Sequence, residues 1–193
     1  MANIGILALQ GDFEKHAHSI EKLGHEALFV KDIQSLDKCD RLIIPGGEST
    51  TFMKLIDRLE LREPLTGFCK TKPVFGTCAG LIVLSSNILN ASFKPLNVIN
   101  LVVERNAYGR QIDSFIDEIN LNVNGSVSTF EAVFIRAPKI KECLNDTVPI
   151  AYHGNDIVMA ANKNILVATF HPELTDDLRI HDFFLNHFTD NPI

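Results

Sequence analysis

The sequence has little positive charge and no long hydrophobic run. It contains 18 Lys and Arg residues against 24 Asp and Glu residues, a formal net charge of −6, and no cluster of basic residues. Because binding to phosphates needs a basic surface, this balance argues against nucleic acid as the main partner. No apolar segment approaches the roughly 20 residues that a transmembrane helix needs, so no membrane partner is expected.

The four cysteines include no Cys-X-X-Cys pair. They are Cys39, Cys69, Cys78 and Cys143, and their spacing is irregular. The first residues lack the basic segment and long apolar stretch of a secretory signal. We therefore expect free thiols and a reducing cytoplasm.

Linkers, internal repeats and low-complexity segments are also missing. The chain has 193 residues, of which 46% are hydrophobic and 22% charged. This length and composition suffice for a substantial core. We expect residues 1–193 to form a single domain.

The first half of the chain alternates short apolar segments with segments of helical periodicity. Residues 4–9 are apolar on both faces, as in a strand that helices cover on both sides of a parallel sheet. Asp12 and Gly24 are suitable caps for the first helix, and Ser49 for a later one. This βαβαβ order predicts an α/β fold with a doubly wound, mostly parallel sheet. The predicted strands are residues 4–9, 27–30, 41–44 and about 72–77, and the predicted helices are residues 12–23, 49–59 and 79–84.

The second half contains short strand-like runs, which predict a partly antiparallel extension of the sheet. Turn sequences at residues 154–155 and 162–164 join the last three runs, so these should form a meander. A final helix at about residues 176–188 has an apolar face for the sheet. The runs are residues 99–104, 111–123, 130–135, 148–153, 157–161 and 165–170.

Cys78 stands between two glycines, in Gly76-Thr77-Cys78-Ala79-Gly80. This spacing is typical of a nucleophile on a sharp turn between a strand and a helix. The amides that open the helix favour the thiolate form of cysteine, which is the reactive one. A buried structural cysteine remains the alternative interpretation of this motif alone.

His171 and Glu173 follow the last predicted strand, in Phe170-His171-Pro172-Glu173. Residues two apart on an extended backbone share a face, so the Glu173 carboxylate can orient the imidazole. A base oriented in this way is what a thiol nucleophile needs for acyl transfer. Because ligands collect at the carboxyl ends of strands in doubly wound sheets, the turns at Gln10-Gly11, Gly46-Gly47 and Cys78 should meet around one pocket.

Seven collinear motifs together resemble the glutaminase subunits of pyridoxal 5'-phosphate synthase, a branch of the class I, triad-type glutamine amidotransferase family. The resemblance covers nearly the whole chain and implies a class I glutamine amidotransferase-like fold with a flavodoxin-like, three-layer arrangement. The motifs are Leu9-Gln10-Gly11, Pro45-Gly46-Gly47-Glu48-Ser49-Thr50-Thr51, Gly76-Thr77-Cys78-Ala79-Gly80-Leu81, Val103-Glu104-Arg105-Asn106, Gly109-Arg110-Gln111, Phe134-Ile135-Arg136-Ala137-Pro138 and Phe170-His171-Pro172-Glu173-Leu174-Thr175.

The resemblance also implies roles for individual residues. Cys78 would be the nucleophile, His171 the general base and acid, and Glu173 its orienting carboxylate. Amides of Gly47 and Ala79 are suited to an oxyanion hole, since glycine lets backbone N–H groups approach a developing charge. The residues implied for the glutamine site are Gly47, Glu48, Ser49, Arg105, Ile135 and Arg136.

The implied reaction is hydrolysis of L-glutamine through a cysteine thioester. Its ammonia would pass to the lyase subunit of the synthase, which builds pyridoxal 5'-phosphate and which would also complete the oxyanion hole. No metal or organic cofactor is expected. The other histidines that we considered show no metal-ligand spacing and are interpreted as structural or solvated; they are His16, His18, His153, His181 and His187.

Two other classes of function remain open at this point. One is a different cysteine hydrolase on a similar sheet, which the closely spaced His171 and Glu173 argue against. The other is a regulatory subunit that binds the synthase without turnover, which the intact triad argues against.

Overall fold

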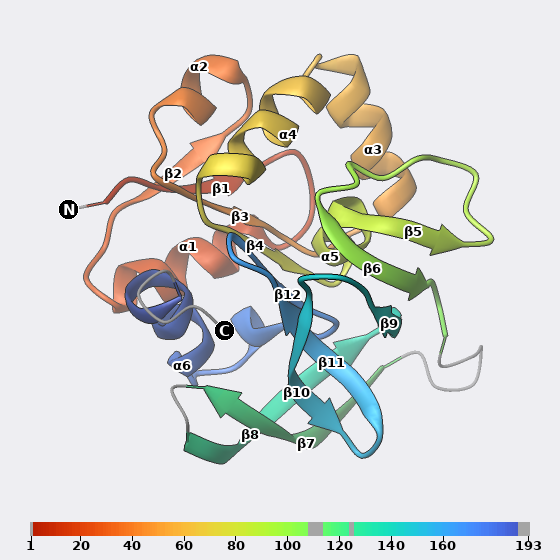
Figure 1. The fold of residues 1–193 in the computed structure, drawn as a ribbon. Coiled ribbons are helices and arrows are strands. Elements are labelled where there is room, and N and C mark those ends of the chain that lie inside the picture. Colours follow the sequence, from red (N-terminus) through yellow and green to blue (C-terminus); the bar gives the residue numbers. More distant parts are fainter. Residues whose placement is uncertain (1, 108–113, 124–125, 189–193) are drawn as a thin grey trace.

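The chain folds around one sheet that carries helices on both faces (Figure 1). The computed structural model describes residues 2–107, 114–123 and 126–188. The strands are β1 (Ile4–Leu7), β2 (Ala27–Val30), β3 (Arg41–Ile44), β4 (Val74–Thr77), β5 (Ser85–Leu89), β6 (Ile99–Glu104), β7 (Ser114–Val123), β8 (Ser126–Ile135), β9 (Lys139–Cys143), β10 (Val148–His153), β11 (Asp156–Ala161) and β12 (Ile165–Ala168). The helices are α1 (Phe13–Lys22), α2 (Ile33–Asp37), α3 (Ser49–Arg58), α4 (Arg62–Thr71), α5 (Ala79–Leu84) and α6 (Arg179–Asp182), with a 3₁₀ turn at Pro172–Leu174 and a π-helical turn at Phe183–His187.

Five neighbouring strands form the parallel part of the sheet, in the order β2-β1-β3-β4-β12. All four residues of β1 are buried. Ile6 packs into the apolar cluster on one face of the sheet and Leu7 into the cluster on the other. The prediction of strands that are covered on both faces is therefore confirmed.

Helices α2 to α5 cover one face of the parallel strands, where Phe52, Leu65 and Leu81 belong to one apolar cluster. Helices α1 and α6 cover the opposite face, where Ile20 and Ile180 belong to the second cluster (Figure 1). The three layers bury apolar side chains on both sides of the sheet, which is the main stabilising term of such a fold.

The sheet continues from β12 through antiparallel strands. β11 pairs with β12 and β10 with β11, so the predicted meander is confirmed. β7 and β8 form a long hairpin beside β10, and β9 pairs antiparallel with β11 and β6. At the end of this branch β5 pairs with β6 in the parallel direction. The predicted fold class, a doubly wound α/β sheet with an antiparallel extension, is confirmed.

Four of the observed elements were not predicted from the sequence, namely α2, α4, β5 and β9. Helix α2 has five residues, which is too short to show a helical period. Helix α4 contains Pro64 and Gly67, residues that usually mark turns in a sequence. β5 follows α5 directly, with no turn residue between them.

The helix caps differ from the prediction at two positions. Glu48 rather than Ser49 is the N-cap of α3, because its carboxylate accepts hydrogen bonds from the amides of Thr50 (2.9 Å) and Thr51 (2.7 Å). Ser49 is already the first residue of the helix. Asp12 precedes α1 as predicted, but its side chain makes no capping hydrogen bond.

Several predicted ends also shift by a few residues. Leu23 is the C-cap of α1, and Gly24 follows it with φ +80°. β12 ends at Ala168 rather than at residue 170. α6 begins at Arg179 rather than near residue 176, because the Asp177 carboxylate accepts the Arg179 amide at 3.0 Å and holds a turn before the helix. Of the predicted strand at 111–123, residues 111–113 lie outside the described residues.

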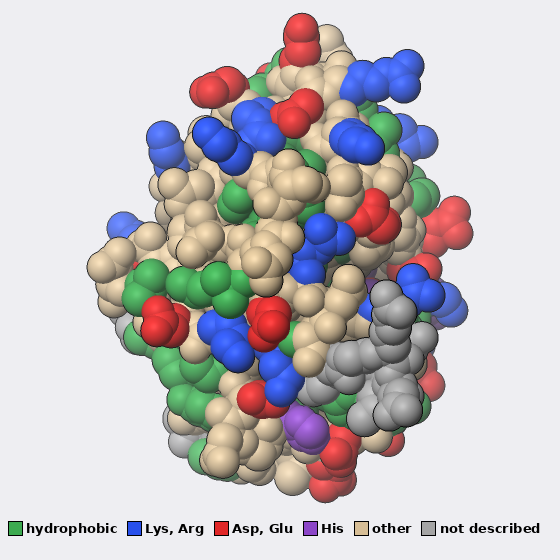
Figure 2. Space-filling model, turned by 90° about the vertical axis from the view of Figure 1, so that its right-hand side faces the viewer, with side chains coloured by type: hydrophobic (Ala, Val, Ile, Leu, Met, Phe, Trp, Pro, Cys, Tyr) green, Lys and Arg blue, Asp and Glu red, His purple; other side chains and the backbone are tan. Residues whose placement is uncertain are grey.

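Charges of both signs are mixed on the surface. On the face shown in Figure 2, Lys and Arg side chains are interspersed with Asp and Glu side chains. Within the part of the chain that the structure describes, no helix is long and apolar enough to cross a membrane.

Candidate active site

Cys78 occupies a strained turn between β4 and α5. Its backbone has φ 47° and ψ −102°, a conformation that residues other than glycine rarely adopt. A methyl group at Gly80 would collide with the Ile44 carbonyl, and one at Gly76 would stand 2.6 Å from a methyl carbon of Leu84. Both glycines are therefore needed for the turn to sit against β3 and α5.

Sheet order brings the candidate residues together. β4 lies between β3 and β12, and each of these parallel strands ends at the same edge of the sheet. Gly46 follows β3, Cys78 follows β4 and His171 follows β12. A methyl group at Gly46 would collide with the His171 ring. The predicted meeting of the turns at Gln10-Gly11, Gly46-Gly47 and Cys78 is confirmed, because Gly11, Gly47 and Cys78 line one cleft, and His171 lines it too.

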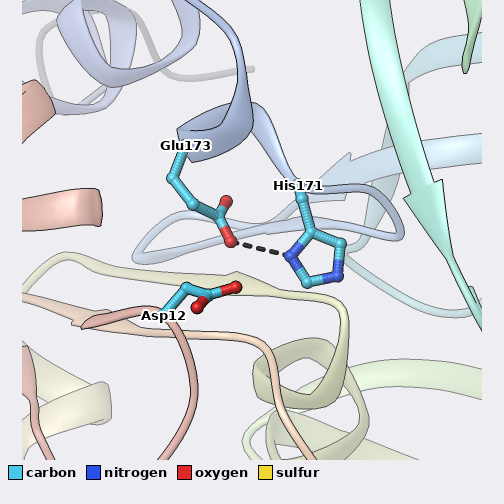
Figure 3. Close-up of side chains that lie close together, drawn as sticks. All are labelled: Asp12, His171 and Glu173. Carbon is cyan, nitrogen blue, oxygen red and sulfur yellow. Dashed lines mark hydrogen bonds and ion pairs between the residues drawn. The ribbon is translucent and has the colours of Figure 1, made fainter. Parts of the chain in front are cut away.

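His171 and Glu173 form a buried pair. The His171 Nδ1 atom lies 2.7 Å from Glu173 Oε1 (Figure 3), and the two residues are 5% and 4% exposed. Burial lowers the pKa of His171, but hydrogen bonds to Cys78 and Glu173 and the charge of Glu173 more than offset this and raise it to about 10. The surroundings of the imidazole therefore favour its protonated form near neutral pH.

The pKa of Glu173 moves in the opposite direction. Burial raises it, but the neighbouring His16 and His171 more than offset this effect and hold the pKa at about 2. Glu173 is ionised at neutral pH. A carboxylate in this state can fix the imidazole with its proton on Nδ1, which leaves Nε2 for the Cys78 side.

A cleft of about 590 Å³ opens in front of Cys78 and His171. The predicted glutamine-site residues all lie along it, whereas Glu173 lies behind His171 and Ala79 is buried at the start of α5. Their roles stay predictions, but their convergence is a property of the fold. The lining residues are Gly11, Asp12, Gly47, Glu48, Ser49, Cys78, Ile82, Arg105, Asn106, Ser114, Ile135, Arg136 and His171.

The Glu48 carboxylate is engaged by protein groups. Burial raises its pKa, but hydrogen bonds from Thr50 and Thr51 more than offset this and lower it to about 2. The same carboxylate lies 3.3 Å from a guanidinium nitrogen of Arg105. The Arg105 guanidinium also lies over the Phe93 ring, 5.4 Å from its centroid. Glu48 therefore holds Arg105 at the cleft while it caps α3.

The end of β8 closes the other side of the cleft. The Cys78 thiol donates to the Ile135 carbonyl over 3.8 Å. Arg136 follows with φ 45°, a turn that ends the strand beside the cleft. The Gly109-Arg110-Gln111 motif lies outside the described residues.

The turn after β3 packs closely against the turn after β1. A methyl group at Gly11 would collide with the Gly46 carbonyl oxygen, and the Gln10 amide donates to the Glu48 carbonyl at 2.6 Å. Gly47 has φ +143°, which glycine adopts without strain. The Gly46 carbonyl thus faces Gly11, and the Gly47 N–H of the same trans peptide points away from Gly11.

Asp12 is a further carboxylate beside the pair. Asp12, His171 and Glu173 each place a potential ligand atom within 4.8 Å of the others, and Figure 3 shows the Asp12 carboxylate lying beside the His171–Glu173 hydrogen bond. The three side chains are close enough together to ligate a cation, but His171 Nδ1 already forms a hydrogen bond with Glu173. From the sequence, we predicted only a helix-capping role for Asp12.

Sequence analysis interpreted His16 and His181 as structural or solvated, and they are structural, but their contacts with each other and with Glu173 were not predicted. Both are fully buried, and His16 Nε2 lies 3.3 Å from Glu173 Oε2. A signal was present at His16, because it belongs to the apolar stripe of α1 with Ala17 and Ile20. A histidine on such a stripe needs a buried partner.

A cysteine on a strained strand-to-helix turn of a doubly wound sheet, with a histidine from the adjacent strand and a carboxylate behind it, is the arrangement that the sequence predicted. The chain belongs to the SNO glutamine amidotransferase family, whose model matches residues 6–190.

Individual relatives agree with the family assignment. The chain is 47% identical over 184 residues to the "Pyridoxal 5'-phosphate synthase subunit PdxT" of Thermosipho africanus, covering 95% of this chain and 97% of that protein. It is 45% identical over 186 residues to the protein of the same name from Bacillus cereus, covering 96% and 94%. A solved structure described as a glutamine amidotransferase superposes with a TM-score of 0.90 at 37% identity, covering 97% of this chain and 99% of that one.

Proposed function

We propose that this protein is the glutaminase subunit of a pyridoxal 5'-phosphate synthase. It hydrolyses L-glutamine to L-glutamate and ammonia and delivers the ammonia to the lyase subunit, which makes pyridoxal 5'-phosphate. The observation that carries this proposal is the convergence of Cys78, His171 and Glu173 at one edge of the sheet, in a chain similar to named synthase subunits.

The first half of the reaction makes the thioester. The Cys78 thiolate attacks the side-chain amide carbon of glutamine, and its proton resides on His171 Nε2. The oxyanion that forms accepts hydrogen bonds from the amides of Gly47 and Ala79. His171 then donates its proton to the departing nitrogen, the C–N bond breaks and ammonia leaves.

The second half returns the enzyme to its starting state. His171, now neutral at Nε2, takes a proton from a water molecule that attacks the thioester carbonyl. The C–S bond breaks, glutamate leaves and Cys78 is again a thiolate beside the imidazolium. Glu173 remains ionised throughout and holds the ring in one orientation. Only side chains and water are required.

The ends of glutamine have suitable partners in the cleft. Arg105 and Arg136 can meet the α-carboxylate, and the backbone of Gly47, Glu48 and Ser49 can contact the rest of the substrate. Ile135 supplies a carbonyl beside the Cys78 sulfur. Since Glu48 is occupied by α3 and Arg105, its part in binding is to position the guanidinium.

Residues 1–193 act as one glutamine amidotransferase domain located in the cytoplasm. Support for a single domain comes from the two apolar clusters, which lie on opposite faces of one sheet. Support for the cytoplasm comes from four free cysteines.

The test is ammonia release from glutamine, measured with and without the synthase lyase subunit, with Cys78→Ala as the control. Glutamine-dependent ammonia that disappears in the control supports the proposal. Absence of ammonia release in both conditions would favour a regulatory subunit, and release from other amides but not from glutamine would favour another cysteine hydrolase.

A further inference from the structure

Two buried histidines lie directly behind the His171–Glu173 pair. His16 of α1 and His181 of α6 are both 0% exposed. Neither lines the cleft in front of Cys78. The two helices cover the same face of the sheet and bring together residues that are 165 positions apart in the sequence.

A chain of polar contacts runs from His181 through His16 to Glu173. His181 Nε2 lies 3.0 Å from His16 Nδ1. The other nitrogen of His16, Nε2, lies 3.2 Å from the Thr77 hydroxyl oxygen, its hydrogen-bond partner, and 3.3 Å from Glu173 Oε2. Among the described residues, no group forms a well-aligned hydrogen bond to Glu173 Oε2, so its contact with His16 is an electrostatic one. His171 uses the first carboxylate oxygen, Oε1. His16 therefore contacts the oxygen that His171 leaves free.

The protons in this chain can be assigned from the partners of each atom. Burial lowers the pKa of His16 and lowers that of His181 to about 3, so both rings are neutral near neutral pH. Among the residues that the structure describes, no group forms a hydrogen bond with the buried His181 Nδ1. An unpaired acceptor is tolerated better than an unpaired donor, so the His181 proton lies on Nε2 and is donated to His16 Nδ1. The His16 proton must then lie on Nε2, facing Glu173 and Thr77.

We propose that His16 is a positioning residue for the glutaminase reaction, held by His181 in the tautomer that directs an N–H at Glu173 Oε2. This inference rests on the proposed function. The His16 N–H lies close to the oxygen that His171 leaves free, so its dipole favours one orientation of the carboxylate toward His171. The second donor also lowers the basicity of the carboxylate, so His171 releases its proton more readily to the departing ammonia.

Other ionisable groups face His171 from the surrounding elements. Cys78 faces it from the start of α5 and Asp12 from the loop before α1, while Glu173, His16 and His181 lie behind it. The remaining charged groups line the cleft and are Glu48, Arg105 and Arg136. Apart from His16 itself, all of these groups are still present when His16 is replaced, so a shift in pH dependence reports on the His16 contact.

The test compares His16→Leu with His16→Gln in the complex with the lyase subunit. Leucine fills space without a donor, whereas glutamine can place an amide N–H near the position of His16 Nε2. We expect His16→Leu to lower kcat about tenfold, as for the loss of one polar contact with a charged group, with KM changed about twofold or less. In His16→Leu, the basic limb of the pH profile of kcat/KM should move to higher pH. His16→Gln should restore both kcat and the position of this limb.

Two further variants act as references. His18→Leu changes the exposed side of the same helix and should behave as the wild type. His181→Leu should shift the profile in the same direction as His16→Leu but less, because it removes only the bond that selects the tautomer. A folded His16→Leu protein with a wild-type pH profile would overturn the inference, as would a His16→Gln protein as impaired as His16→Leu.

A second readout separates this inference from the proposed function. Alkylation of Cys78 by iodoacetamide needs no glutamine, and burial raises the pKa of the other three thiols to about 11 for Cys39 and Cys143 and about 12 for Cys69. The pH dependence of Cys78 alkylation should shift in His16→Leu and return in His16→Gln. If the shift is present without glutamine hydrolysis, the proposed function fails and the His16 contact stands. If glutamine is hydrolysed but the pH dependence of alkylation does not shift, the proposed function stands and the His16 inference fails.

Discussion

The His171 imidazole separates two environments that differ in their access to water. In front lies a cleft of about 590 Å³, which loop residues after several strands line. Behind lie Glu173, His16 and His181, which are 4%, 0% and 0% exposed. We call these the front and the rear of the site.

The difference follows from what each side must do. In the proposed reaction, bonds to carbon form and break in front, where glutamine and water enter and ammonia leaves. Nothing is exchanged at the rear, so packing between α1 and α6 can hold the orienting groups in one geometry. Changes in front should therefore alter turnover with little change in stability, whereas changes at the rear should alter both.

Replacing the nucleophile should have the largest effect. Cys78→Ala should lower ammonia release from glutamine about 10³-fold or more, since the thiolate makes the bond to carbon. Cys78→Gly should lose as much activity but unfold at higher urea concentration than Cys78→Ala, because φ 47° costs a non-glycine residue about 1–3 kcal/mol.

Ammonium salt provides the control for that experiment. Added to the complex of Cys78→Ala with the lyase subunit, it should restore synthesis of pyridoxal 5'-phosphate. Turnover of glutamine by Cys78→Ala above about one hundredth of the wild-type rate would remove Cys78 from the role of nucleophile.

The next prediction compares the activity of a variant at His171, which faces the front, with that of a variant at Glu173, which lies at the rear. His171→Ala should lose about as much activity as Cys78→Ala, because no base remains. Glu173→Gln should be milder, since an amide can still orient the ring but cannot stabilise the imidazolium. Steady-state rates between pH 6 and 9 measure both, and Glu173→Gln rates equal to wild type throughout would exclude Glu173 from the mechanism.

Gly47→Ala changes only the front of the site and tests the proposed oxyanion donor there. A Cβ at Gly47 would stand 3.2 Å from the side-chain amide carbon of Gln10, on a backbone with φ +143°. If the lyase subunit acts by turning the Gly46–Gly47 peptide toward Cys78, this substitution should lower the activated kcat about 10²-fold, the effect of one lost oxyanion donor. Glutamine KM should change less. A rise in KM with full activation by the lyase subunit would contradict this mechanism.

The smallest effect concerns stability at the rear. Glu173 has a pKa of about 2 in the folded protein and about 4.3 when unfolded, so its ionised form contributes stability above pH ~4.3 that is lost as pH falls toward 2. The contribution is about 2–3 kcal/mol. Urea unfolding of wild type and Glu173→Gln between pH 2 and 6 should show a difference that shrinks as pH falls. A constant difference would show that Glu173 is not held ionised.

Local patterns in the sequence determined most of the framework. The strands at residues 27–30 and 41–44 were predicted with the observed bounds, because each is a short, mostly apolar run. The helix that begins at Ala79 was predicted because it follows the turn at Cys78. The elbow at Cys78 and the spacing of His171 and Glu173 were also visible, since their geometry depends on neighbours within two residues.

The tertiary structure decided the contacts that no local pattern contains. Glu48 caps α3 instead of Ser49 because its longer side chain reaches the helix amides and Arg105 together. His16 and His181 meet because α1 and α6 cover the same face of the sheet. The sequence by itself determined which residues could carry the chemistry. Only the packing of distant helices decided which buried polar groups had to satisfy one another behind His171, because burial removes the water that would otherwise pair with them.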